Sequence, residues 1–110
     1  MKVLVCGGRN YHDVVKIVNR LADVGVTHLI VGDANGADAI AAAYCLGLQI
    51  PVAMYKADWD KYDKAAGPIR NKEMLDENPD IDLVLRFPGG IGTANMASQA
   101  VKRKIRIVQA

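Results

Sequence analysis

The residues best suited to chemistry form a short glycine-rich run, Pro88-Gly89-Gly90-Ile91-Gly92-Thr93. Three glycines in four positions allow backbone angles closed to other residues and let main-chain N–H groups approach a ligand closely. A helix is expected to follow, and its dipole favours an exposed negative charge by about 0.3–1 kcal/mol. The run therefore predicts a phosphate-binding turn to which Thr93 adds a hydroxyl; the alternative is a tight turn that Thr93 caps without a ligand.

Two arginines could add positive charge to such a site. Arg9 follows Gly7-Gly8 at the end of a predicted strand, where its planar fork of donors could reach an anion or could simply be solvated. Arg70, followed by Asn71, is expected in the first turn of a helix, where a cation is unfavourable unless a negative group lies nearby. We therefore expect both arginines to contact the ligand.

A polar segment between a predicted strand and a predicted helix carries acceptors suited to a sugar. Asp33, Asn35 and Asp38 could accept hydrogen bonds from ribose hydroxyls, with Gly36 between them. Alternatively, Asn35 or Asp38 caps the following helix or lies in its first turn. The residues leave both interpretations open.

Trp59 is the only tryptophan in the chain, and it lies with Tyr62 in a long polar segment from Lys56 to Gly67. An aromatic ring with no obvious apolar face could stack on the base of a ligand. It could equally anchor the segment on the core. Trp59 is thus a candidate binding residue with a structural alternative.

The cysteines argue against a metal site. Cys6 and Cys45 form no Cys-x-x-Cys pair and lie at no metal-ligand spacing from a histidine, so we expect reduced thiols, no metal and no cofactor. Cys6 ends a predicted buried strand, and neither His12 nor His28 is placed as an evident base. It is therefore expected to fill space rather than to act as a nucleophile.

The elements that position these segments are strands alternating with helices. Apolar runs bounded by glycine or proline predict strands, and apolar residues at helical spacing predict helices. The predicted strands cover 3–6, 28–31, 50–55, 82–87 and 105–108, and the predicted helices cover 14–24, 37–46, 68–76 and 93–102.

This alternation predicts the α/β class, a three-layer Rossmann-like fold with a five-stranded parallel sheet of order 3-2-1-4-5 and helices on both faces. The continuous apolar runs agree, because such strands are buried on both sides. The chain reverses direction between the first and fourth strands, which places a crevice at their carboxyl ends. The glycine-rich and polar segments all follow strands, so we expect them to converge on that edge.

Composition sets the outer limits. A chain of 110 residues with 51% hydrophobic content is expected to form one domain over 1–110. No stretch approaches the roughly 20 apolar residues of a membrane helix, which predicts a cytoplasmic protein without a membrane partner. The net charge of +2 is too small to indicate nucleic-acid binding by itself.

The segment from Lys102 to Arg106 concentrates positive charge near the end of the chain. Three of its cations, Lys102, Arg103 and Lys104, are expected in the last turn of a helix, where they complement the dipole. A nucleic-acid contact is the alternative.

Taken together, these segments resemble the SLOG superfamily, which includes the lonely-guy phosphoribohydrolases and the DNA-processing protein DprA. The chain is most similar to its small YspA- and YpsA-related branch. The motifs that carry the resemblance are Val5-Cys6-Gly7-Gly8-Arg9-Asn10-Tyr11, Gly36-Ala37-Asp38, Asp58-Trp59, Ala66-Gly67-Pro68-Ile69-Arg70-Asn71 and Phe87 to Met96.

The resemblance also exposes a departure at Met96. In the lonely-guy enzymes the turn runs Pro-Gly-Gly-x-Gly-Thr-x-x-Glu, and that glutamate works with an arginine to cleave the N-glycosidic bond of a nucleoside monophosphate. The arginine maps to Arg70, whereas the glutamate maps to Met96, which can neither stabilise an oxocarbenium ion nor activate water. The resemblance therefore implies phosphate binding without the acidic half of the catalytic pair.

Three functions follow as expectations. The first is a module that binds a nucleotide or nucleotide-derived ligand, as a sensor or by sequestration. The second is a phosphoribohydrolase in which Arg70 acts with an aspartate, Asp38 being the candidate we assign and Asp33, Asp58 and Asp60 the others on the same edge. The third is a DprA-like nucleic-acid binder.

We also expect a homo-oligomer, a dimer or higher, because a small sheet covered by short apolar helices leaves hydrophobic surface to hide. The residues considered for that surface are Ala41, Ala42, Tyr44 and Cys45. The alternative is that these four residues belong to the core.

Overall fold

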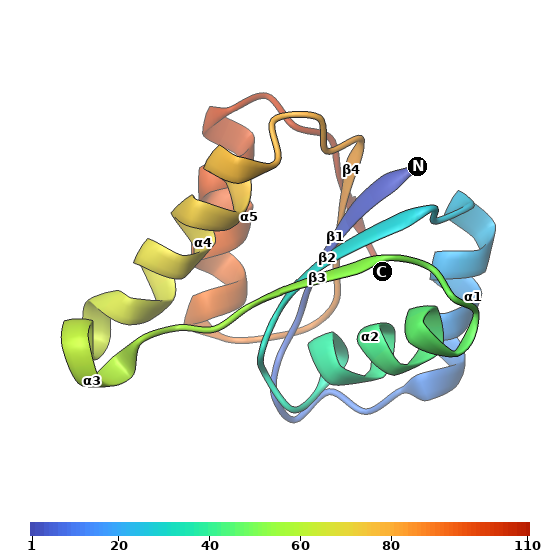
Figure 1. Ribbon diagram of the computed structural model, residues 1–110, viewed down its shortest axis with the longest axis horizontal. Helices are drawn as coiled ribbons and strands as arrows, with labels where there is room; N and C mark the ends of the chain where they lie inside the picture. Colours follow the sequence, from blue (N-terminus) through green and yellow to red (C-terminus); the bar gives the residue numbers. More distant parts are fainter.

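The computed structural model describes residues 1–110 as a parallel sheet between two layers of helices (Figure 1). Its strands are β1 (Lys2–Cys6), β2 (His28–Gly32), β3 (Val52–Tyr55), β4 (Leu83–Arg86) and β5 (Ile107–Gln109). Its helices are α1 (Val14–Val24), α2 (Ala37–Gly47), α3 (Trp59–Tyr62), α4 (Ala66–Glu77) and α5 (Ile91–Lys102), with a 3-10 turn over Asp63–Ala65. The five strands lie in the order β3-β2-β1-β4-β5, which confirms the predicted Rossmann-like fold.

Two apolar clusters join the layers, and the central strand β1 contributes to both. Val3 and Val5 face the cluster that α1 and α2 cover, whereas Leu4 and Cys6 face the cluster under α4 and α5. Successive side chains of a strand point to opposite faces, so a strand covered on both sides must be apolar throughout. That requirement explains the continuous apolar runs of the sequence.

The small residues of α2 are core residues rather than a surface. Ala41, Ala42 and Cys45 are buried, and Tyr44 packs against the same cluster. Their position against β1 and β2 removes them as a self-association surface. The large apolar side chains exposed nearby are those of Leu46, Leu48 and Met54.

The polar segment before α4 is more ordered than its composition predicts. Asp58 caps α3 by accepting a hydrogen bond from the backbone N–H of Lys61 at 3.1 Å. Helix α4 then begins at Ala66, so Pro68 is its third residue rather than its first. The first N–H groups of a helix have no partner within it, and proline is therefore tolerated there. Consequently Arg70 lies in the second turn of α4, not in the first turn as predicted.

The C-terminal part differs from the prediction in two respects. Helix α5 begins at Ile91, two residues before Thr93, and of the clustered cations only Lys102 lies within its last turn. Arg103 follows the helix and pairs with Asp76 at 2.6 Å, and Lys104 has a left-handed φ of 60°. The chain thus turns before β5 instead of continuing the helix, and β5 begins at 107 rather than at 105.

The two central strands end beside one another, with Cys6 of β1 in register with Arg86 of β4. After β1 the chain leads to α1 on one face, whereas after β4 it leads to α5 on the other. The diverging connections open a crevice at this edge of the sheet. None of the helices is both long and apolar enough to span a bilayer.

Candidate functional site

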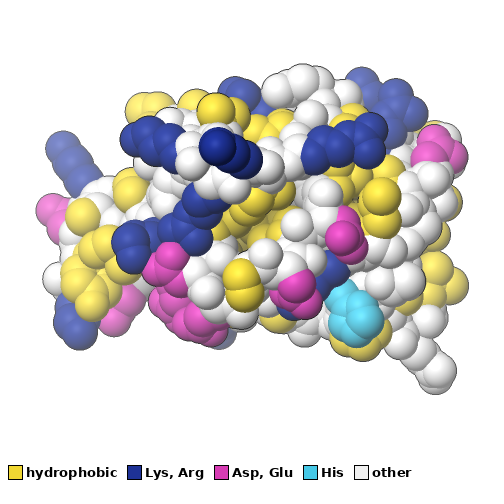
Figure 2. All heavy atoms as spheres, turned by 90° about the horizontal axis from the view of Figure 1, so that it is seen from above, with side chains coloured by type: hydrophobic (Ala, Val, Ile, Leu, Met, Phe, Trp, Pro, Cys, Tyr) yellow, Lys and Arg dark blue, Asp and Glu magenta, His cyan; other side chains and the backbone are white.

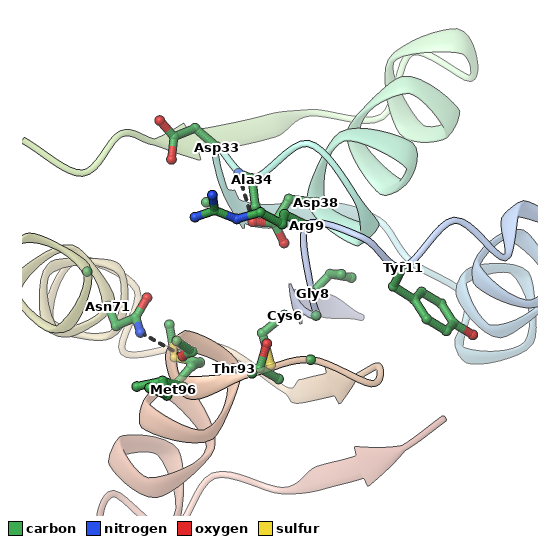
Figure 3. Close-up of a pocket in the computed structure, with 18 of the residues that line it drawn as sticks. Cys6, Gly8, Arg9, Tyr11, Asp33, Ala34, Asp38, Asn71, Thr93 and Met96 are labelled. Carbon is green, nitrogen blue, oxygen red and sulfur yellow. Dashed lines mark hydrogen bonds between the residues drawn. The ribbon is translucent and has the colours of Figure 1, made fainter. Parts of the chain in front are cut away.

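A cleft of about 980 Å³ lies at this edge of the sheet. Connections after β1, β2 and β4 form its walls together with α3 and α4, so segments distant in sequence meet there (Figure 3). The predicted site residues that line the cleft are Gly7, Gly8, Arg9, Asp33, Asn35, Asp38, Trp59, Arg70, Asn71, Pro88, Gly89, Gly90, Gly92 and Thr93. Of the predicted set, Gly36 alone does not line it.

The turn before α5 presents free backbone donors to the cleft. None of the N–H groups from Gly89 to Thr93 donates to another backbone or side-chain atom, and no side chain caps the helix. Gly89, Gly90 and Gly92 are exposed, whereas the Thr93 side chain is buried beneath them. A row of unpaired N–H groups at a helix N-terminus attracts an anion.

The glycines of this turn are needed for space rather than for unusual backbone angles. None of them has a positive φ; the one glycine that does is Gly25, which ends α1. A side chain at Gly89 would collide with Oγ1 of Thr93 and approach the backbone N of Gly8 to 2.6 Å. Around Gly90 and Gly92, by contrast, a Cβ atom would meet nothing within 4 Å. Close packing therefore requires a glycine only at position 89, and the other two leave open room at the cleft.

Gly36 packs against the backbone of the connection that follows β1. A Cβ atom there would collide with the carbonyl oxygen of Gly8 and lie 2.7 Å from the backbone of Arg9. That same oxygen of Gly8 accepts a hydrogen bond from the N–H of Ala37 at 3.3 Å. On the other side, the N–H of Gly8 donates to the carbonyl oxygen of Pro88 at 2.8 Å. Gly8 thus connects the loop after β2 to the turn before α5.

Arg70 lies between acidic and amide groups. Its Nη1 donates to Oδ1 of Asp33 at 3.1 Å, and its Nε donates to Oδ1 of Asn71 at 3.1 Å. Asp33 is thus a negative neighbour of Arg70, although Arg70 lies in the second turn of α4, where the conflict with the helix dipole that suggested such a neighbour does not arise. Arg9 is exposed and forms no ion pair, and its side chain extends into the cleft (Figure 3). One arginine is held in place and the other is free.

Asn71 connects α4 to α5. Its buried side-chain amide donates to the carbonyl oxygen of Gly92 at 3.2 Å and to Oδ1 of Asn95 at 3.1 Å. Gln99 donates to the same Asn95 oxygen at 2.8 Å. Because both donors and the oxygen of Asn71 are occupied within the protein, its contribution to the site is to hold the turn and Arg70 in position.

Asp38 is the buried carboxyl group of the cleft, only 5% exposed. Its Oδ2 accepts a hydrogen bond from the N–H of Ala34 at 3.3 Å, whereas its Oδ1 has no partner. Burial raises the pKa of Asp38 from 3.8 to about 6, and neighbouring Asp33 adds to the rise. The Ala34 N–H and the Arg70 guanidinium oppose it and lower the pKa.

Three buried sulfur-containing residues, Cys6, Met74 and Met96, line the cleft. Burial, with a smaller effect of Asp38, raises the pKa of Cys6 to about 12, so its thiol stays protonated at neutral pH and is a poor nucleophile. Met96 is 1% exposed and packs within the cluster under α4 and α5. No carboxylate therefore occupies the position where the lonely-guy motif has glutamate.

Aromatic rings border the cleft on two sides. Trp59 is 53% exposed and belongs to neither core cluster, so it does not anchor its segment on the core. Instead it lies beside Gly67, where a Cβ atom would be 3.5 Å from its ring. Tyr11, which was not among the predicted site residues, also lines the cleft, with its ring 5.6 Å from that of Phe87. Its place directly after the Gly-Gly-Arg-Asn run was the signal available in the sequence.

The remaining candidates lie outside the cleft. Asp58 caps α3 and Asp60 is exposed, and neither lines the site. Helix α5 runs about 18 Å from the turn to Lys102, so the basic segment 102–106 lies at the far end of the molecule. Figure 2 looks onto that end, where several Lys and Arg side chains lie above an apolar area and acidic side chains and a histidine lie below it.

Fold and site together define a Rossmann-like domain with a cleft at the reversal of strand order, lined by unpaired backbone N–H groups and two arginines. The chain belongs to the YspA, cpYpsA-related SLOG family, whose model matches residues 1–62. It is also 29% identical over 118 residues to the Gene 61 protein of Mycobacterium phage D29, covering 97% of this chain and 94% of that protein. The turn at 88–93 lies beyond the residues that the family model matches.

Proposed function

We propose that this protein binds a nucleotide or a nucleotide-derived ligand and that the turn Pro88–Thr93 holds its phosphate. The observation that carries the proposal is the row of unpaired N–H groups from Gly89 to Thr93, which opens into the cleft at the start of α5. Membership of the SLOG family is consistent with a nucleotide-related binding module. No covalent chemistry is needed for this function.

The arginines support the same assignment. Arg9 is exposed at the cleft without an ion pair, so its guanidinium is available to an incoming anion. Arg70 is already oriented by Asp33 and Asn71, and it could pair with a phosphate without losing the bond from its Nε. Paired donors in a rigid fork suit phosphate oxygens better than a lysine would.

The absence of a carboxylate on α5 favours binding over cleavage. Met96 is buried and apolar where the related hydrolases have an acidic group. Loss of one acid–base group typically lowers a rate by about 10²–10⁴, while backbone N–H groups would still bind the phosphate. We therefore favour a sensor or a sequestering protein.

Isothermal titration with paired ligands tests this function. Nucleoside monophosphates should bind, whereas the corresponding nucleosides should bind at least tenfold more weakly because they lack the phosphate. Arg9→Ala should weaken the monophosphates and leave the nucleosides unaffected, and Arg106→Ala, an exposed arginine outside the cleft, is the matched control. Equal affinity for nucleosides and nucleotides, or no binding to either, would overturn the proposal.

A second candidate function rests on Asp38. A buried carboxyl whose pKa is near 6, close to Arg70, has the protonation behaviour of a general acid for N-glycosidic cleavage. Incubation with AMP-type substrates and measurement of the free base tests this hydrolase. Equal base release by the wild type and by Arg70→Ala would exclude it.

A further inference from the structure

One buried side-chain atom of this protein lacks a hydrogen-bond partner, and it is Oδ1 of Asp38. Buried acceptors are normally paired, because desolvation without a hydrogen bond is costly. The Asp38 side chain is nearly inaccessible to solvent and lines the cleft. The missing donor is therefore expected from a ligand in that cleft.

The position of Asp38 at the start of α2 gives a hydrogen-bond partner to only one of its two carboxyl oxygens. In the first turn of α2 the charge is favourable to the dipole, and Oδ2 accepts from the N–H of Ala34. Arg70 lies close by but donates instead to Asp33 and Asn71. Nothing within the protein uses Oδ1.

The carboxyl group lies across the cleft from the phosphate-binding turn. A Cβ atom on Gly32 would be 3.0 Å from Oδ2 of Asp38, which places the group at the end of β2. The turn lies at the ends of β1 and β4, where Gly89 packs against Gly8. Figure 3 shows Asp38 and Thr93 on facing sides with Cys6 and Gly8 between them.

This arrangement fixes the size of the group between the two sites. Neighbouring strands are about 4.8 Å apart, so one to two strand spacings separate the carboxyl group from the turn, about 5–10 Å. In a pentose 5-phosphate the phosphate group and the ring hydroxyls are separated by a distance of this order. The base of a nucleotide would lie farther away, beyond the sugar.

We propose that Oδ1 of Asp38 accepts a hydrogen bond from a ring hydroxyl of a pentose 5-phosphate whose phosphate lies on the turn Gly89–Thr93. The cleft is then selective for ribose-phosphate ligands, and it disfavours ligands with a second anionic group beside Asp38. This inference rests on the proposed phosphate site and adds the sugar as the second recognised group.

Two small phosphate esters without a base test the inference: ribose 5-phosphate, and methyl phosphate, which has no hydroxyl. Binding is followed by the amide NMR signals of Gly90 and Gly92 at millimolar ligand. Wild-type protein should bind ribose 5-phosphate more tightly, and Asp38→Ala should reduce the ratio of the two affinities about 10- to 100-fold, the effect of one hydrogen bond to a charged group. Asp60→Ala makes the same charge change at an exposed position outside the cleft and should leave the ratio unchanged.

The outcomes separate the sugar from the phosphate. If Asp38→Ala keeps the wild-type ratio while both esters still shift the Gly90 and Gly92 signals, the role of Asp38 is refuted and the phosphate site stands. If neither the esters nor any nucleotide shifts those signals, the phosphate site itself is refuted. The wild type also provides a test without any variant: 1,4-anhydroribitol, 2-deoxyribose and 3-deoxyribose 5-phosphates each lack one ring hydroxyl. If all three bind as tightly as ribose 5-phosphate, the inference is overturned.

Discussion

The side-chain amide of Asn71 donates a hydrogen bond of 3.2 Å to the main-chain oxygen of Gly92. This bond crosses from α4 to the first turn of α5, and the oxygen of the same Asn71 side chain accepts from Nε of Arg70. One buried side chain therefore positions both the turn before α5 and the Arg70 side chain in the same cleft. The relative position of the turn and Arg70 therefore depends on Asn71.

Replacement of Asn71 by alanine should both destabilise the fold and weaken ligand binding. Its loss removes two partly buried hydrogen bonds, to the oxygens of Gly92 and Asn95, which typically costs about 1–3 kcal/mol. Urea denaturation measures the first effect and calorimetry with a nucleoside monophosphate measures the second. Asn19→Ala, at an exposed position of α1, is the control and should change the free energy of unfolding by less than about 0.5 kcal/mol. An Asn71→Ala protein of wild-type stability would contradict this role.

The glycines of the turn should respond in opposite ways. Gly92→Ala adds a methyl group to open space in a helix, so stability should be unchanged or should rise by up to about 1 kcal/mol, while the phosphate loses its close approach and affinity falls. Gly89→Ala should instead lower stability, because the backbone of Gly8 would have to move. Denaturation and ligand titration of both variants, with Gly47→Ala as the control at the end of α2, distinguish the two cases. Undiminished affinity in Gly92→Ala would argue against a phosphate at this position.

The sequence predicted the strand order and the edge of the cleft because both depend on patterns that extend over many residues. Apolar runs such as Val3 to Cys6 are required by burial on both faces, and the order of strands and helices then leaves few topologies. The start of α4 was harder to predict from the sequence. Pro68 is compatible with any of the first positions of a helix, so it could not show that the helix begins at Ala66.

The sequence predicted which residues line the candidate site, but not the contacts that these residues make within the protein. Gly36 and Asn71 were both predicted to contact a ligand. In the structure Gly36 leaves room for the backbone of Gly8, and the Asn71 amide donates hydrogen bonds to Gly92 and Asn95. Such roles depend on contacts between segments distant in sequence. The unpaired oxygen of Asp38 is of the same kind, because a carboxylate at the start of a helix looks like a cap or a dipole partner until its surroundings are known.

The stability of the protein should depend on pH through Asp38. Its pKa in the folded state is about 6, above its ordinary value of 3.8, so the folded state holds a proton that the unfolded state has lost. Stability should therefore fall as the pH rises from about 4 to 6 and level off above 6, by up to about 3 kcal/mol. Burial and the neighbouring Asp33 favour the protonated form of Asp38, whereas the N–H of Ala34 and the Arg70 guanidinium favour the ionised form.

Asp38→Asn isolates this titration, because ionisable groups elsewhere titrate alike in both proteins. The difference in unfolding free energy between variant and wild type, followed by urea denaturation at several pH values, should grow between pH 4 and 6 in favour of the variant. A difference that stays constant over that range would mean that Asp38 titrates at its ordinary value.

Reinstating the glutamate of the related hydrolases at Met96 should damage the fold rather than create an enzyme. Met96 is 1% exposed and packs with Leu4, Met74 and Ala100 under α4 and α5, so a carboxyl group there would lose its hydration without gaining a partner. A polar group buried in this way costs about 2–5 kcal/mol, whereas Met96→Leu conserves the volume and should cost less than about 1.5 kcal/mol. Thermal denaturation of the two variants gives the comparison. This prediction would be contradicted if Met96→Glu were as stable as Met96→Leu and released base from a nucleoside monophosphate. In that case the cleft would need only a carboxylate at position 96 to cleave the ligand.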